Sequence, residues 1–124
     1  MNRYVMIGIG GFLGAIARYQ IAVMIQARVP AGFPWGTFVV NVSGCFIMGI
    51  VMTLLTERLI VNPEWRFLIP IGFIGAYTTF STFAYELFQA NTEGAWLVGG
   101  AYLAASVIAG YVALWAGVVL SRVI

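Results

Sequence analysis

The sequence alternates long apolar stretches with short polar connectors. Four of the stretches are each at least as long as the ~20 residues that an α-helix needs to cross the hydrocarbon core of a bilayer. They cover residues 4–26, 37–56, 66–89 and 95–120. The three connectors between them each contain proline or asparagine, which are typical of turns and loops. The pattern predicts an all-α membrane protein with a single transmembrane domain of four spanning helices.

The third stretch departs from a regular helix pattern at residues 72–86, which read GFIGAYTTFSTFAYE. Gly72 and Gly75 have low helix propensity, and the run from Thr78 to Phe83 crowds β-branched, hydroxylated and aromatic residues together. In a bilayer, a helix break is tolerated only where protein or a lined cavity satisfies the freed backbone groups. A break also exposes carbonyl ends, which suit cations, and amide ends, which suit anions. We therefore expect the third helix to be broken near its middle and to line an ion path.

Composition narrows the class of protein. The chain has 124 residues, of which 62% are hydrophobic and 8% are charged, a balance that indicates an integral membrane protein. It contains no histidine and no aspartate, the residues of a catalytic triad and of a histidine-based zinc site. We therefore expect neither an enzyme nor a nucleic-acid-binding protein. Cys45 lies alone in an apolar run, which favours a packing role over a disulfide or a metal cluster.

The charges suggest an orientation in the bilayer. The first stretch continues past Arg18 without a small-residue cleavage site, so we expect a retained span and not a cleaved signal. Four spans place both termini and the second connector on one side of the membrane, and Arg28 on the other. The arginines on the terminal side are Arg3, Arg58, Arg66 and Arg122. By the positive-inside rule, this distribution favours cytoplasmic termini, by a margin of only a few charges.

Glycine recurs along all four stretches. Gly10 and Gly14 form a GxxxG face on the first, a pattern typical of closely packed membrane helices. Close packing of four helices leaves no room for a water-filled passage inside one subunit. A conduction path, if there is one, is therefore expected between subunits.

Several polar residues lie at membrane depth. Arg18 either reaches the nearer interface with its long side chain or provides a fixed charge that attracts anions. Asn41, four residues after Thr37 on the same helical face, either makes an interhelical hydrogen bond or donates one to an anion. Tyr102 and Ser106 are likewise four residues apart on the fourth span, so they are expected to form a polar stripe.

Two phenylalanines and one acid lie beside the expected break. Phe80 and Phe83 ordinarily indicate packing or lipid contact, but the positive edge of an aromatic ring can also hold an anion without a formal charge. Such weak binding suits permeation, because the ion has to be released again. Glu86 is the only acid inside a span, and it follows Phe83 on the same face. In an anion path, this glutamate has to be protonated, paired or mobile.

Three blocks of the sequence resemble the Fluc family of fluoride channels, also called CrcB proteins. They are GGFLGAIARY at residues 10–19, GTFVVNVSGCFIMG at 36–49 and GFIGAYTTFSTFAYE at 72–86. The resemblance covers essentially the whole chain. It implies a multi-pass protein of the bacterial inner membrane that forms an antiparallel, dual-topology homodimer with two fluoride pores, each lined by both subunits. Pairing of two paralogous chains, as in some family members, is the alternative.

The resemblance also implies roles for individual residues. Phe80 and Phe83 present ring edges to fluoride, and Asn41 donates a hydrogen bond to it. Arg18 raises the potential at the wide entrance. The remaining residues of the implied fluoride pathway are Thr37, Ser81, Thr82, Glu86, Tyr102 and Ser106.

A structural sodium ion at the centre of the dimer is a further implication. In the family, backbone carbonyls at the break hold this ion, and Gly75 and Thr78 match those positions. Carbonyl oxygens suit sodium as a hard cation, and two-fold symmetry doubles each ligand. The sequence departs from the family pattern at Gly110, where some relatives carry a hydroxyl.

The leading functional hypothesis is a passive channel that exports fluoride and protects a bacterial cytoplasm into which HF diffuses. A proton-coupled exporter of the small multidrug-resistance type is the main alternative, because such proteins share the size and the four spans. They depend on a carboxylate in the first span, where this chain has Arg18 and no acid. A structural subunit of a larger complex is a third possibility, but it does not explain Asn41 and Glu86 at membrane depth.

Overall fold

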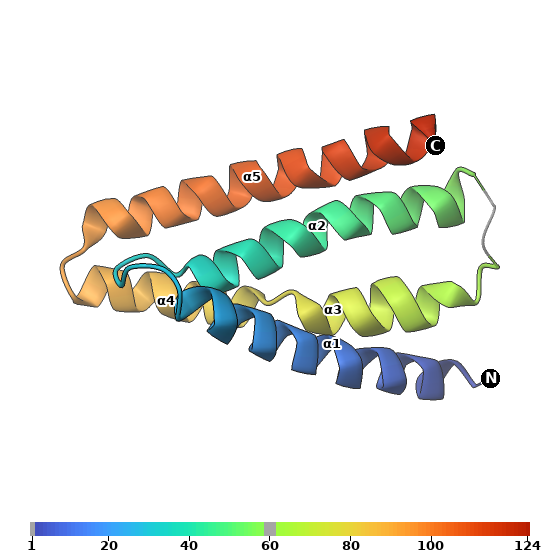
Figure 1. The fold of residues 1–124 in the computed structure, drawn as a ribbon, viewed down its shortest axis with the longest axis horizontal. Coiled ribbons are helices and arrows are strands. Elements are labelled where there is room, and N and C mark those ends of the chain that lie inside the picture. Colours follow the sequence, from blue (N-terminus) through green and yellow to red (C-terminus); the bar gives the residue numbers. More distant parts are fainter. Residues whose placement is uncertain (1, 59–61) are drawn as a thin grey trace.

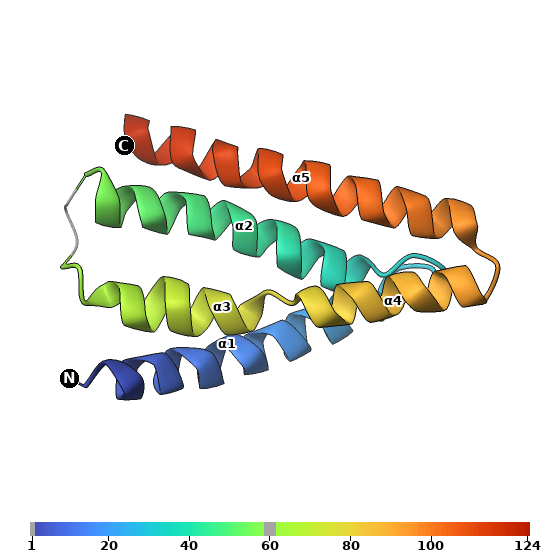
Figure 2. The ribbon, with the colours of Figure 1, turned by 180° about the vertical axis from the view of Figure 1, so that it is seen from behind.

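The computed structural model describes residues 2–58 and 62–124 as a layered bundle of helices (Figure 1). Residues 59–61, within the connector expected at 57–64, lie outside the described residues. The helical elements, in chain order, are α1 (Arg3–Gln26), α2 (Trp35–Thr56), η1 (Phe67–Ile74), α3 (Gly75–Tyr77), α4 (Phe80–Thr92) and α5 (Trp96–Val123). In both ribbon views, α2 lies between α5 and the broken third span, and α1 flanks that span (Figure 2).

The four predicted spans are confirmed. Within the described ranges, four helical segments are long and apolar enough to cross a membrane, and the third of them runs through η1, α3 and α4. The observed ends differ from the predicted ones by at most three residues: the second helix begins two residues earlier, and the third and fourth end three residues later. Both termini lie at the same end of the bundle, as an even number of spans requires (Figure 1).

The third span is broken where the sequence predicts. α3 ends at Tyr77 and α4 begins at Phe80, and the two residues between them are extended, with ψ angles of 156° at Thr78 and 121° at Thr79. Thr79 is also the N-cap of α4, because its hydroxyl accepts a hydrogen bond from the amide of Thr82. A β-branched, hydroxylated pair therefore ends one helix and starts the next.

The first half of this span is a π-helix, which the sequence reasoning did not anticipate. η1 contains Pro70, and its C-cap Gly75 donates its amide to the carbonyls of Gly72 and Pro70. Proline has no amide to donate, so an α-helical ladder is interrupted at its position. Widened turns of this kind are frequent at functional sites.

The GxxxG face of α1 packs directly on η1. A Cβ atom added to Gly10 would overlap the carbonyl oxygen of Leu68, and one added to Gly14 would overlap that of Phe73. The two backbones can therefore approach this closely only because both positions are glycine.

α2 and α5 meet in the same way. A Cβ atom on Gly49 would overlap the carbonyl oxygen of Leu114, and one on Gly117 would overlap that of Phe46. These reciprocal contacts hold α5 against the face of α2 that is turned away from α1. The close packing expected from the glycines is confirmed in both helix pairs.

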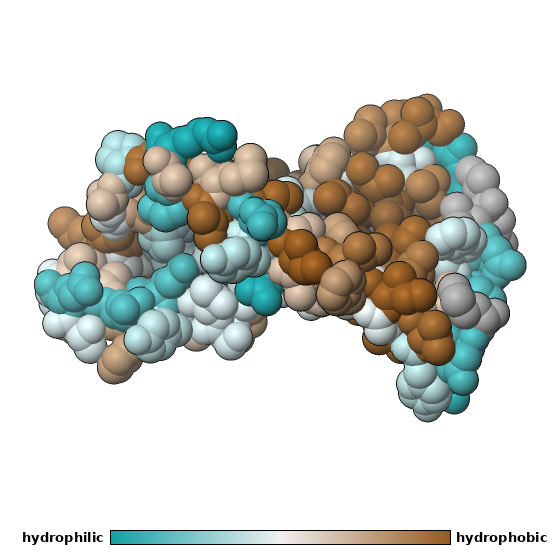
Figure 3. All heavy atoms as spheres, turned by 60° about the horizontal axis from the view of Figure 1, so that its bottom comes forward, coloured by the Kyte–Doolittle hydropathy of each residue, from teal (hydrophilic) through white to brown (hydrophobic). Residues whose placement is uncertain are grey.

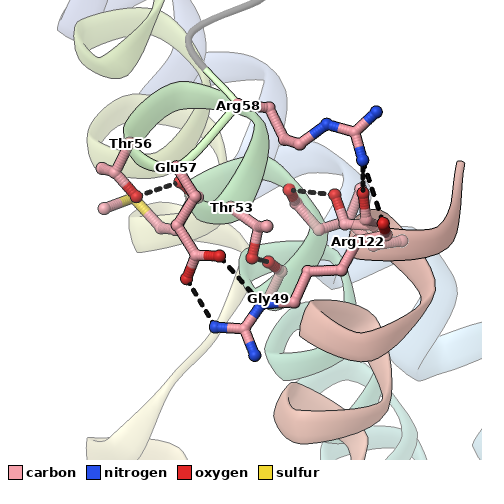
Figure 4. A network of polar contacts seen from close by, with 9 residues as sticks. Gly49, Thr53, Thr56, Glu57, Arg58 and Arg122 are labelled. Carbon is pink, nitrogen blue, oxygen red and sulfur yellow. Dashed lines mark hydrogen bonds and ion pairs between the residues drawn. The ribbon is translucent and has the colours of Figure 1, made fainter.

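Polar contacts fasten α2 to α5 at the end of the bundle that carries the termini (Figure 4). Arg122 makes two hydrogen bonds with the carboxylate of Glu57, at 2.7 and 2.8 Å, and Arg58 donates to the carbonyls of Arg122 at 3.0 Å and Ser121 at 3.5 Å. The Arg122 guanidinium lowers the pKa of Glu57 from its ordinary value of 4.5. The pair is exposed to solvent, so we expect it to contribute little to stability.

The outer surface suits a bilayer. Figure 3 shows hydrophobic residues gathered over one half of this face, whereas hydrophilic residues lie at the edge of that half and over much of the other half. Large apolar side chains are exposed along the helices, including Phe12 of α1, Leu97 of α5 and Trp115 of α5. An exposed apolar surface of this extent marks contact with lipid or with another chain.

Candidate ion pathway

Asn41 of α2 hydrogen-bonds the backbone at the break in the third span. Its Nδ2 donates to the carbonyl of Thr79 at 3.0 Å, and its Oδ1 accepts from the amide of Thr79 at 2.8 Å. The interhelical hydrogen bond, one of the two roles expected for this residue, is therefore present. The second Nδ2 hydrogen makes no bond within the described chain, which leaves one donor for another ligand.

The carbonyl ends exposed by the break fall into two groups. The carbonyl of Ile74 accepts from the amide and the hydroxyl of Thr78, each at 3.0 Å, and that of Ala76 accepts from Arg18 Nε at 3.1 Å. The carbonyls of Gly75 and Thr78 accept no hydrogen bond from any residue that the structure describes. The two positions expected to bind sodium thus carry oxygens without a partner in the described chain.

Glu86 of α4 lies between hydroxyls from two other helices. Its Oε1 accepts from Thr37 Oγ1 of α2, and its Oε2 accepts from the Tyr102 hydroxyl of α5, both at 2.7 Å. Within the described ranges, no arginine forms an ion pair with this carboxylate. Glu86 was expected to be protonated, paired or mobile. In the structure it is paired, because both of its carboxylate oxygens accept hydrogen bonds from uncharged hydroxyls.

The two phenylalanines differ in their surroundings. Phe83 is only 7% exposed and packs edge-on against Tyr102, with the ring centroids 5.0 Å apart. Phe80 is 80% exposed, although its ring centroid lies only 5.8 Å from that of Phe83. Phe80 therefore projects from the surface of the chain at the break, where another chain or lipid has to cover it.

Cavities flank the break on both sides. One, of about 270 Å³, is lined at the break by Thr78 and Phe80 and by residues of α2 that include Asn41. A second, also of about 270 Å³, brings together Arg18, Thr37, Thr79, Thr82 and Glu86. A third, of about 420 Å³, reaches Glu86 from the loop side. Most of the candidate pathway residues thus line one of these cavities, whereas Phe83, Ser81 and Ser106 line none of the three.

Two of the candidate residues are less well connected. Ser81 is exposed, and its hydroxyl lies 3.5 Å from that of Thr79, a long contact. The hydroxyl of Ser106 is buried without a hydrogen-bond partner among the described residues. Gly110 is buried one turn further along α5, and a Cβ atom there would lie 3.5 Å from the sulfur of Cys45. The polar stripe predicted on α5 is therefore joined to Glu86 only through Tyr102.

The sequence reasoning missed the loop that ends α1. The Gln26 amide donates to the carbonyl of Phe33 at 3.2 Å and accepts from the amide of Gly36 at 3.2 Å. The Phe33 ring packs edge-on against Tyr102, with a centroid distance of 5.3 Å. The sequence signal for this loop was a polar residue, Gln26, at the end of the first span, followed by a connector that contains the aromatic Phe33. The loop thereby holds the far side of the tyrosine that bonds Glu86.

The fold and the site define a multi-pass membrane protein whose third span is discontinuous. Such discontinuous helices occur where backbone groups are buried in protein or line a path for ions or substrates. Within the described ranges, no group of histidine, cysteine, aspartate or glutamate could hold a metal ion through side chains.

Comparison with known proteins identifies the family. Residues 5–118 match the model of the family described as "CrcB-like protein, Camphor Resistance (CrcB)", so the chain belongs to the CrcB family. It is 50% identical over 120 residues to the fluoride-specific ion channel FluC of Solibacter usitatus, covering 97% of this chain and 98% of the relative. It is 44% identical to the FluC of Acidobacterium capsulatum, covering 97% and 96%. The resemblance predicted from three sequence blocks is confirmed.

Proposed function

We propose that this protein is a passive, fluoride-selective channel of the bacterial inner membrane that exports fluoride from the cytoplasm. Relatives that are 50% and 44% identical over nearly their whole length are named fluoride-specific ion channels, which supports the choice of ion. The observation that carries the proposal is the break itself. There, neutral donors from α2 and α5 bond the carboxylate of Glu86, and the rings of Phe80 and Phe83 lie 5.8 Å apart beside a cavity that Phe80 lines.

Neutral donors fit the demands of conduction. A small anion has to lose water on entry, so the path has to replace the lost hydrogen bonds, yet bind weakly enough to release the ion. The free Nδ2 hydrogen of Asn41 and the ring edges of Phe80 and Phe83 offer such contacts without a fixed positive charge. The hydroxyls of Thr37 and Tyr102 already bond Glu86, so an approaching fluoride competes with that carboxylate for them.

The working unit in this proposal is an antiparallel homodimer. Phe80 is 80% exposed at membrane depth beside the cavity that Asn41 lines, so one wall of the path is missing from a single chain. A second copy seated at the break supplies that wall and produces two equivalent pores by symmetry. The small surplus of arginine on the terminal side is compatible with insertion in both orientations.

A structural sodium ion fits the same centre. The carbonyls of Gly75 and Thr78 would hold it, because they are hard oxygen donors that accept no hydrogen bond from the described residues. Two-fold symmetry would bring four such oxygens together. When bound, the ion offsets the partial negative charge of these helix ends and links the two subunits.

Flux from liposomes tests the function. Purified protein is reconstituted in vesicles loaded with potassium fluoride, valinomycin compensates the charge, and a fluoride electrode records efflux. We expect fluoride to leave down its own gradient at a rate that an imposed proton gradient does not change, while vesicles loaded with potassium chloride retain chloride. Equal chloride efflux would contradict the selectivity. A strict requirement for a proton gradient would favour the exporter instead.

A further inference from the structure

Arg18 connects α1 to the break in the third span. We propose that Arg18 is a positioning residue for the sodium site, acting through the carbonyl of Ala76. This role rests on the proposed channel function, and it goes beyond the attraction of anions by a positive charge. The carrying observation is the hydrogen bond from Arg18 Nε to the Ala76 carbonyl, at 3.1 Å.

The position of Ala76 explains why this bond matters. Its carbonyl lies in the chain between those of Gly75 and Thr78, which accept no hydrogen bond in the described structure. Backbone carbonyls at a helix end are loosely held when they lack the next turn of helix. By fixing the Ala76 carbonyl, Arg18 limits rotation of the peptide units on either side, and so orients the two free oxygens.

α1 is rigid enough to serve as this support. Gly14 lies one helical turn before Arg18, and it packs so closely on the third span that a Cβ atom would overlap the Phe73 carbonyl. Two successive turns of α1 thus contact backbone oxygens of Phe73 and Ala76, three residues apart. Nε is the guanidinium nitrogen nearest to the Arg18 backbone, and Arg18 also lines the cavity that Glu86 lines.

A positioning role and a purely electrostatic role for Arg18 predict opposite changes in sodium affinity when the residue is replaced. A fixed positive charge near a cation site repels the cation, so removal of the charge alone should tighten sodium binding. Loss of the support, by contrast, should loosen the carbonyls and weaken sodium binding. The sodium dependence therefore separates the two roles, which a measurement of fluoride flux alone does not.

The test uses Arg18→Gln in the purified, full-length protein. Thermal unfolding is followed while sodium replaces N-methyl-D-glucamine at constant ionic strength, because a ligand that binds only the folded state raises the unfolding temperature. We expect the sodium concentration for half of the stabilisation to rise about tenfold in the variant, the scale of one charge-assisted hydrogen bond. An unchanged or lower concentration would overturn the proposal.

Two further variants complete the design. Arg28→Gln removes a positive charge from the exposed loop after α1, where Arg28 bonds the Met24 carbonyl and not the third span, and should leave the sodium dependence unchanged. A rise equal to that of Arg18→Gln would overturn the proposal. If Arg18→Gln does not fold, Arg18→Lys keeps the charge but lacks the Nε donor, and it should still raise the sodium concentration. Fluoride flux through the wild-type protein tests the channel function independently.

Discussion

Replacement of Asn41 with aspartate tests the closure of the break most directly. Aspartate keeps the oxygen that accepts from the Thr79 amide, but it places a second oxygen where Nδ2 now donates to the Thr79 carbonyl at 3.0 Å. One hydrogen bond is lost, and two oxygens face each other. The change also adds a negative charge beside the proposed anion path.

The magnitude follows from the groups left without partners. A buried acceptor that loses its donor costs roughly 1–3 kcal/mol, and charge repulsion adds to that figure. Water in the adjoining cavity of about 270 Å³ can reach the freed carbonyl and reduce the cost. We therefore expect Asn41→Asp to lower the free energy of unfolding by about 2–3 kcal/mol and to abolish fluoride flux.

Stability in detergent and flux from liposomes are measured on the same preparation. Ser43→Ala is the matched control, because Ser43 lies two residues further along α2 and bonds the Val40 carbonyl and the Tyr77 hydroxyl. It should cost about 1 kcal/mol or less and leave Thr79 held by Asn41. Wild-type stability and flux in Asn41→Asp would refute both the closure and the place of Asn41 in the path.

Three other predictions concern separate parts of the molecule. Phe80→Leu should slow fluoride flux severely with little loss of stability, because the ring is exposed on the surface of the chain. Phe83→Leu should reduce both flux and stability, because that ring is buried. Normal flux in both variants would mean that the rings only pack. Gly14→Ala should destabilise the protein by about 1–3 kcal/mol, seen by thermal unfolding, because its methyl group meets the η1 backbone. The pKa of Glu57 is lowered by Arg122, so the small stabilisation from this pair should be present at neutral pH and disappear as the pH falls below about 4.5; an equal acid response in Glu57→Gln would show that other groups cause it.

The main features of the fold could be predicted because they depend on local pattern. Span length follows from runs of apolar residues, and the break follows from the cluster of threonines and aromatics after Gly75. The π-helical turns around Pro70 could not be predicted, because proline inside a span is equally compatible with a simple kink.

The candidate site was predictable as a set of residues but not as a set of contacts. Arg18, Asn41 and Glu86 stand out because polar groups are rare in apolar spans. Their partners depend on helix register over long separations: Ala76 is 58 residues from Arg18, and Thr79 is 38 residues from Asn41. The loop contact between Phe33 and Tyr102 was missed for the same reason.

The two hydrogen bonds between Asn41 and Thr79 also bear on how such a protein could be switched on or off. Both polar backbone atoms of Thr79 are hydrogen-bonded to Asn41, so a rearrangement of this residue has to break two hydrogen bonds. We therefore expect this segment to stay rigid and not to act as a gate. In a channel without a gate at this position, ion selectivity alone protects the cell against the loss of other ions, for as long as the protein is in the membrane.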